Sequence, residues 1–189
     1  MIETIKKTTI DNIYAYFIVL VGIGFFFPLE ALGVPSQYYV FAFGLKILVF
    51  LIYGVSILPA IILAKLTYML LMSDIGSDPM LAIHLSLISA TAPAIAMYAM
   101  NMTNVNTLKN LSKIDFRHVI FFIGLTSILS SLTKYIYISN FMPLDAEAAA
   151  FLSNYLLGHL IGGFVVVYLA VKLVPNFYLF IAKFAMKKN

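Results

Sequence analysis

The stretch PSQYYVFAFGLKILVFLIYGVSILPAIILAKLTYMLLMS, residues Pro35–Ser73, decides the fold of this chain. It holds two long apolar runs that meet at the turn-forming residues Gly54–Ser56. Pro59 falls in the first turn of the second run, where a missing N–H is tolerated. The stretch therefore predicts a helical hairpin in a membrane.

Each run of the hairpin carries one cation, Lys46 in the first and Lys65 in the second, and neither run contains a carboxylate. At ~1.5 Å per residue, both lysines are expected ~12–14 Å from the bend, near the middle of a ~30 Å hydrocarbon layer. Charges at that depth are costly. Three interpretations stand: the lysines bind an anionic ligand, pair with an acid of a partner helix, or bond to backbone carbonyls and hydroxyls.

Composition extends the membrane prediction to the whole chain. The chain has 189 residues, of which 62% are hydrophobic and 11% charged, as in polytopic membrane proteins. We expect a single all-α transmembrane domain over residues 1–189. Its six transmembrane helices are expected at about 13–34, 38–54, 57–73, 80–101, 116–139 and 147–174, followed by a short amphipathic helix at 176–187 on the membrane surface.

The distribution of charge predicts the orientation. In the six-helix arrangement, nine cations fall on one side of the membrane: Lys6, Lys7, Lys109, Lys113, Arg117, Lys172, Lys183, Lys187 and Lys188. The other side has only Lys134, together with five acidic residues. By the positive-inside rule we expect both termini in the cytoplasm and a multi-pass protein of a bacterial inner membrane. Arg117 and the lysines of the C-terminal tail are expected to contact anionic membrane lipid, and no nucleic acid partner is expected.

Four polar residues in the outer half are candidates for a ligand site: His84, Lys134, Asn154 and His159. We expect them to line an outward-facing cavity with Lys46 and Lys65 deeper, unless each merely forms a hydrogen bond to a neighbouring helix. Two histidines without a nearby carboxylate make a poor metal site, so no metal or cofactor is expected. No arrangement of nucleophile and base, no carboxylate pair and no cysteine is present, so an enzyme is not expected.

Small residues form two stripes suited to close helix packing. One is Ser86, Ala90 and Ala94; the other is the GxxxG pair Gly158 and Gly162, extended by Gly163. Both interpretations of the GxxxG pair stay open: a face for a partner protein, or packing within the same bundle. Pro93, inside the span at 80–101, is expected to kink that helix and free a backbone carbonyl for another partner.

Gly44, Gly54 and Pro59 are placed as in a known family. The hairpin resembles the core of the MASE class of membrane-associated sensor domains, first type, in which a helix with a central glycine ends in a glycine turn before a proline. IDFRHVIFFIGLTSILSSL (residues 114–132) is similar to a later helix of that family. The resemblance implies a sensory module. Members are typically fused to kinase or cyclase output domains, so this chain is expected to act through a separate partner protein.

The predicted function is therefore an integral membrane sensory or partner-binding module that recognises a small, possibly anionic ligand. Six helices in 189 residues also look like the substrate-binding S subunits of energy-coupling-factor vitamin transporters. A purely structural subunit of a membrane complex is the third alternative.

Overall fold

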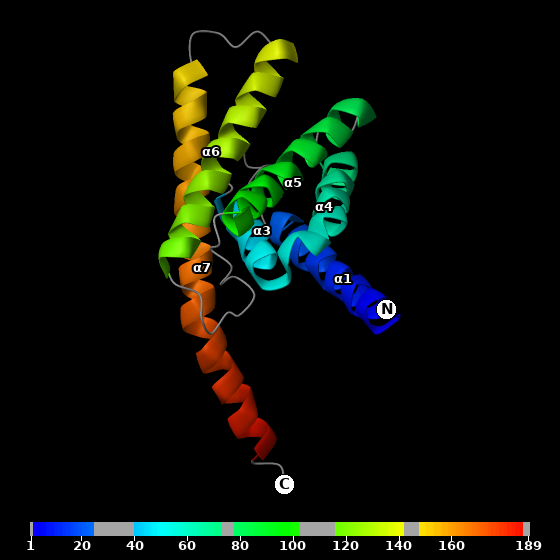
Figure 1. Cartoon of the computed structure of the whole chain (residues 1–189), viewed down its shortest axis with the longest axis vertical. Helices are drawn as coiled ribbons and strands as arrows, with labels where there is room; N and C mark the ends of the chain where they lie inside the picture. Colours follow the sequence, from blue (N-terminus) through cyan, green and yellow to red (C-terminus); the bar gives the residue numbers. More distant parts are fainter. Residues whose placement is uncertain (1, 25–39, 73–77, 103–115, 142–147, 187–189) are drawn as a thin grey trace.

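The computed structural model describes residues 2–24, 40–72, 78–102, 116–141 and 148–186, and their regular structure is helical (Figure 1). The elements are α1 (Ile2–Gly24), α3 (Val40–Tyr53), the 3-10 turn η2 (Gly54–Ile57), α4 (Leu58–Met72), α5 (Pro79–Met102), α6 (Phe116–Phe141) and α7 (Ala148–Met186). The predicted all-α class is confirmed for these residues.

The six α-helices pack as a closed ring. Around it, α1 packs against α3, α3 against α7, α7 against α6, α6 against α5, α5 against α4, and α4 against α1. The hairpin arms α3 and α4 diverge from η2 (Figure 1), and each packs more extensively against α1 than against the other arm. Helices that follow each other in the chain are therefore not always neighbours in the ring.

The bend predicted between the two apolar runs is present as η2. Gly54 has a φ of 76°, a left-handed conformation that favours glycine. Asn12 of α1 holds the bend: its side-chain amide donates to the Ser56 carbonyl at 3.0 Å, and its side-chain oxygen accepts from the Ala60 N–H at 3.3 Å. The hairpin bend and the N-terminal half of α1 thus lie at the same end of the ring.

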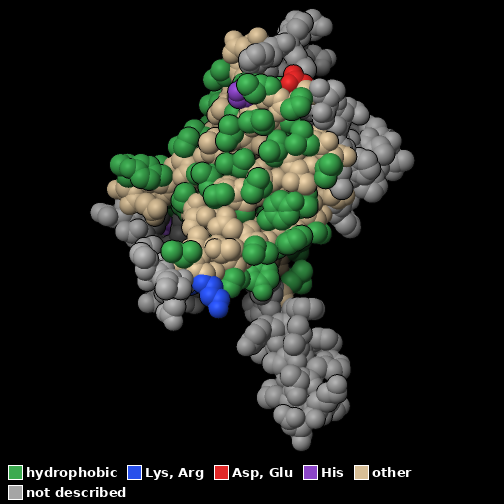
Figure 2. Space-filling view, turned by 90° about the vertical axis from the view of Figure 1, so that its right-hand side faces the viewer, with side chains coloured by type: hydrophobic (Ala, Val, Ile, Leu, Met, Phe, Trp, Pro, Cys, Tyr) green, Lys and Arg blue, Asp and Glu red, His purple; other side chains and the backbone are tan. Residues whose placement is uncertain are grey.

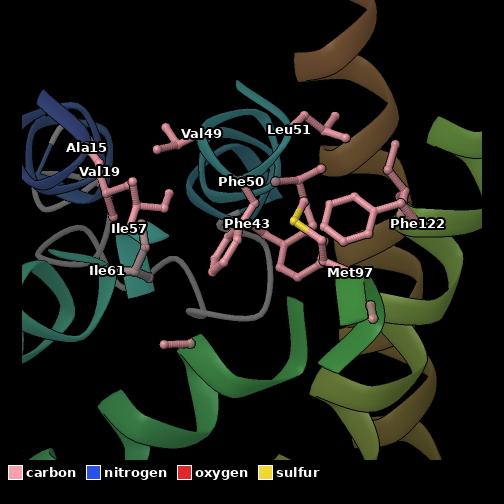
Figure 3. Close-up of a cluster of buried hydrophobic side chains, with 14 of the residues drawn as sticks. Ala15, Val19, Phe43, Val49, Phe50, Leu51, Ile57, Ile61, Met97 and Phe122 are labelled. Carbon is pink, nitrogen blue, oxygen red and sulfur yellow. The ribbon is translucent and has the colours of Figure 1, made fainter. Parts of the chain in front are cut away.

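Large apolar side chains fill the interior of the ring (Figure 3). Phe43 and Phe50 of α3 lie beside Met97 of α5 and Phe122 of α6, and Ile57 continues the cluster toward α1. The outer surface is apolar too: in Figure 2, charged side chains appear only near the upper and lower margins of the described surface. Since lipid is as apolar as this interior, close packing rather than exclusion from water must hold the ring together.

Four segments of the described residues are long and apolar enough to cross a membrane: Ala42–Leu71, Pro79–Met102, Arg117–Tyr137 and Leu152–Ala170. The first runs from Ala42 in α3 through η2 to Leu71 in α4. The described part of α1 is not among them; it begins at Ile2, ahead of the predicted start at 13, and includes Lys6, Lys7 and Asp11. Residues 25–34 of the predicted first span lie outside the described residues. The structure thus supports an all-helical membrane protein with four candidate spans.

The separate surface helix predicted at 176–187 is not seen as such, because α7 continues without a break through Pro175 to Met186. Proline removes one backbone hydrogen bond from a helix and disturbs its preceding turn, and a long helix can absorb this by bending. Figure 1 shows α7 changing direction in its C-terminal part.

Candidate functional site

Lys46 is a buried cation at the centre of the ring. Its side chain is only 6% exposed, and its Nζ donates to the Ser89 carbonyl at 2.7 Å and to the Ser89 hydroxyl at 2.9 Å. It also lies 5.1 Å from the centre of the Phe43 ring. An ammonium group has three donors, and among the described residues Lys46 donates two hydrogen bonds, both to Ser89.

Pro93 explains why the Ser89 carbonyl is available to Lys46. In an α-helix the N–H of residue 93 would bond to the carbonyl of residue 89, and proline has no N–H. The lysine supplies the missing donor from α3. The prediction that Pro93 frees a carbonyl for another partner is therefore confirmed, and that partner is the intramembrane cation.

His159 of α7 lies next to Lys46 through a shared aromatic ring. Its imidazole stacks on Phe43, with ring centres 4.0 Å apart and planes 15° apart. Its Nδ1 lies 3.4 Å from the hydroxyl of Ser131, a long hydrogen-bonding distance. Tyr155, one turn earlier in α7, meets the same imidazole edge-on at 5.6 Å.

Lys134 of α6 completes a continuous series of contacts. Its Nζ lies 4.8 Å from the centre of the Tyr155 ring, which contacts His159. Basic groups and aromatic rings thus alternate across three helices in the order Lys134, Tyr155, His159, Phe43 and Lys46. We call these five residues the basic column.

Glycines let the helices of the basic column approach closely. A Cβ atom on Gly44 would collide with the carbonyl oxygen of Gly162 and with Val166. Gly44 is adjacent to Phe43, and Gly162 follows His159 by three residues, so this contact places the imidazole against the phenyl ring. On the other side of α7, a Cβ on Gly163 would collide with Ile123 of α6.

A group of buried hydroxyls on α6 accompanies the column. Ser131 contacts His159, whereas the hydroxyls of Thr126, Ser127 and Ser130 are buried and have no hydrogen-bond partner among the described residues. These residues precede Lys134 at helical spacings that keep them on adjoining faces of α6. The sequence prediction missed them, although the run TSILSS within an apolar helix was a usable signal.

The other predicted ligand residues are not among the five residues of the column. Lys65 sits on the second hairpin arm, 4.9 Å from the Tyr68 ring. The half-buried His84 lies 5.7 Å from Tyr137, between ring centres, and Asn154 is exposed. The structure therefore joins Lys46, Lys134 and His159 in one series of ring contacts, and the ring contacts of Lys65 and His84 are with other aromatic residues.

The predicted small-residue stripes contribute to packing inside the ring. Gly158 is buried, Gly162 contacts α3 and Gly163 contacts α6. Of the stripe on α5, Ser86 and Ala90 are buried and Ala94 is partly buried. The Ser86 hydroxyl donates to the Ala82 carbonyl at 2.7 Å, within its own helix.

The column has one sign of charge. None of the four candidate membrane segments contains Asp or Glu. Among the described residues, no three His, Cys, Asp or Glu side chains gather as metal ligands. Because charges interact strongly in a medium of low dielectric constant, this arrangement is chemically suited to attracting an anion.

Comparison with protein-family models, with curated proteins and with solved structures finds no match to this chain.

Proposed function

We propose that this chain is an integral membrane module that binds a small anion at the basic column and acts through a separate protein. The observation that carries the proposal is the alignment of Lys46, His159 and Lys134 inside a ring whose candidate spans contain no acidic residue. An anion would accept a hydrogen bond from the remaining N–H of Lys46. The buried hydroxyls of α6, which lie on the same helix as Lys134, are further donors for an anion.

A sensory role fits the resemblance of the hairpin to the MASE class. Ligand binding would favour one packing of α3 against α6 and α7, and the change would reach a partner protein at the cytoplasmic ends of the helices. The proposed orientation, with six spans and both termini in the cytoplasm of a bacterial cell, is supported by the Asn12 contacts, which place the bend beside the helix that carries Lys6 and Lys7.

An S-type transport subunit is the second candidate, because a buried anion site also suits substrate capture. Recovery of the chain with ATPases and a coupling membrane protein would favour transport, whereas recovery with a kinase or a cyclase would favour sensing. A structural subunit would co-purify with protein on its helix faces and with no small molecule.

Ligand-dependent stability tests the anion site directly. The purified protein in nanodiscs is heated with citrate, inorganic phosphate or acetate, and its Tm is followed by circular dichroism. At least one anion should raise the Tm of the wild type, since a ligand that binds only the folded state stabilises it by about 2.7 kcal/mol at 100 times its Kd.

Two lysine substitutions make the test specific. Lys46→Met and Lys134→Met should abolish the rise in Tm. Lys172→Met is the matched control, because Lys172 also lies over a tyrosine ring, Tyr168 at 5.5 Å, but outside the column. An equal rise in wild type and Lys46→Met would refute the proposed site.

A further inference from the structure

A groove of about 740 Å³ runs along the outside of the ring between α1, η2 and the start of α4. Its walls come from residues 5–17 of α1 and residues 56–63 beyond the bend. It does not adjoin any residue of the basic column, so it is a separate feature of the surface.

The polarity of the groove changes along its length. The half nearer the N-terminus of α1 is lined by Thr8, Thr9 and Asn12 together with Ile5, and the other half ends at Phe17 and Leu63. Phe17 is 57% exposed and Leu63 is 54% exposed, so these apolar walls are open to the surroundings. A molecule that matches this gradient has a polar end and an apolar chain.

The length of the groove matches one leaflet of a bilayer. Ile5 and Phe17, its outermost lining residues on α1, are twelve positions apart, which is ~18 Å at 1.5 Å per residue. Half of a ~30 Å hydrocarbon layer is ~15 Å. The groove is therefore long enough to hold an acyl chain of about the length of one leaflet.

A lysine, Lys6, lies near the end of the groove that is closer to the N-terminus of α1. Lys6 is exposed and precedes Ile13 and Phe17 by seven and eleven residues, spacings that place the three on one face of α1. Lys7 lies ~100° further round the helix. Asp11 is on the side of α1 away from the groove by the same spacing, whereas Glu3 precedes Lys6 by three residues.

From these observations we infer that the groove binds one anionic phospholipid, with its phosphate at Lys6 and one acyl chain along Ile13, Phe17 and Leu63. The inference uses charge complementarity, length and polarity, and it does not rest on the proposed anion site. Because Asn12 joins α1 to η2 at the base of the groove, the bound lipid would lie against the contact that holds the hairpin bend.

Native mass spectrometry tests this inference. The full chain is purified in detergent and mixed with equal amounts of phosphatidylglycerol and phosphatidylcholine of the same acyl chains. Wild type is expected to retain phosphatidylglycerol several-fold more than phosphatidylcholine. Lys6→Gln should remove this preference, and Lys7→Gln should keep most of it.

A second pair of variants separates the groove from general attraction to charge. Thr9→Phe places a ring in the groove and should reduce retention of both lipids, whereas Ile10→Phe, at an exposed neighbour outside the groove, should retain both as wild type does. Equal retention of the two lipids by wild type, equal loss in both lysine variants, or unchanged binding by Thr9→Phe would each overturn the inference. Circular dichroism confirms that the variants are folded.

Discussion

Replacing Gly44 by alanine should destabilise the ring where α3 meets α7. A Cβ at this position would lie closer than 3.0 Å to the Gly162 carbonyl oxygen and to Val166, a separation that real Cβ atoms essentially never show. A backbone carbonyl cannot rotate away, so the two helices must move apart. Overpacking of this kind costs about 1–3 kcal/mol.

Gly124→Ala on α6 is the matched control, because a Cβ there meets nothing within 4 Å. Both substitutions gain helix propensity of up to about 1 kcal/mol, so this term cancels in the comparison. The free energy of unfolding of Gly44→Ala should therefore be lower than that of Gly124→Ala by about 1–3 kcal/mol.

The assay is unfolding by SDS in mixed micelles, followed by circular dichroism. Gly163→Ala adds a graded case: its Cβ would meet the side chain of Ile123, which can shift, so its loss should be smaller than that of Gly44→Ala. If Gly44→Ala proves as stable as Gly124→Ala, the close approach of α3 and α7 is refuted.

Three further predictions use the same unfolding measurement. Pro93→Ala should restore part of the stability lost in Lys46→Met, because alanine supplies the N–H that the Ser89 carbonyl then lacks; independent, additive effects would contradict this coupling. Asn12→Ala removes both contacts to the bend, so it should cost about 1–3 kcal/mol and speed hydrogen exchange in η2. Thr126→Val removes a buried hydroxyl without a partner among the described residues and should be neutral or stabilising; a clear loss of stability would show that the hydroxyl has a partner.

The sequence predicted features that depend on local chemistry. Gly54 marked the bend because a left-handed turn favours glycine, and Pro93 marked a freed carbonyl because proline lacks an N–H. Lys46 stood out as a site residue because a cation in an apolar run demands an explanation. Each of these predictions used only a residue and its immediate neighbours in the chain.

Features that depend on which helices meet could not be predicted in this way. The spacing of Lys46 and Lys65 about the bend could not show whether they face one site; in the structure the arms diverge and each lysine lies over a different ring. Apolar helices offer lipid and protein similar surfaces, so sequence periodicity does not reveal which face points inward. The partnership of His159 with Phe43 is set by the glycine contact between α3 and α7.

The contact between α3 and α7 also has a consequence for synthesis. The two helices meet although about half of the chain lies between them, and chains emerge from the ribosome N-terminus first. Lys46 can find Ser89 as soon as α5 is inserted, but the Gly44 surface stays without its partner until α7 arrives. In the nascent protein, the Gly44 surface of α3, close to Lys46, is therefore not covered by protein until α7 is inserted. The packing of α7 against α3 is a late step of biogenesis.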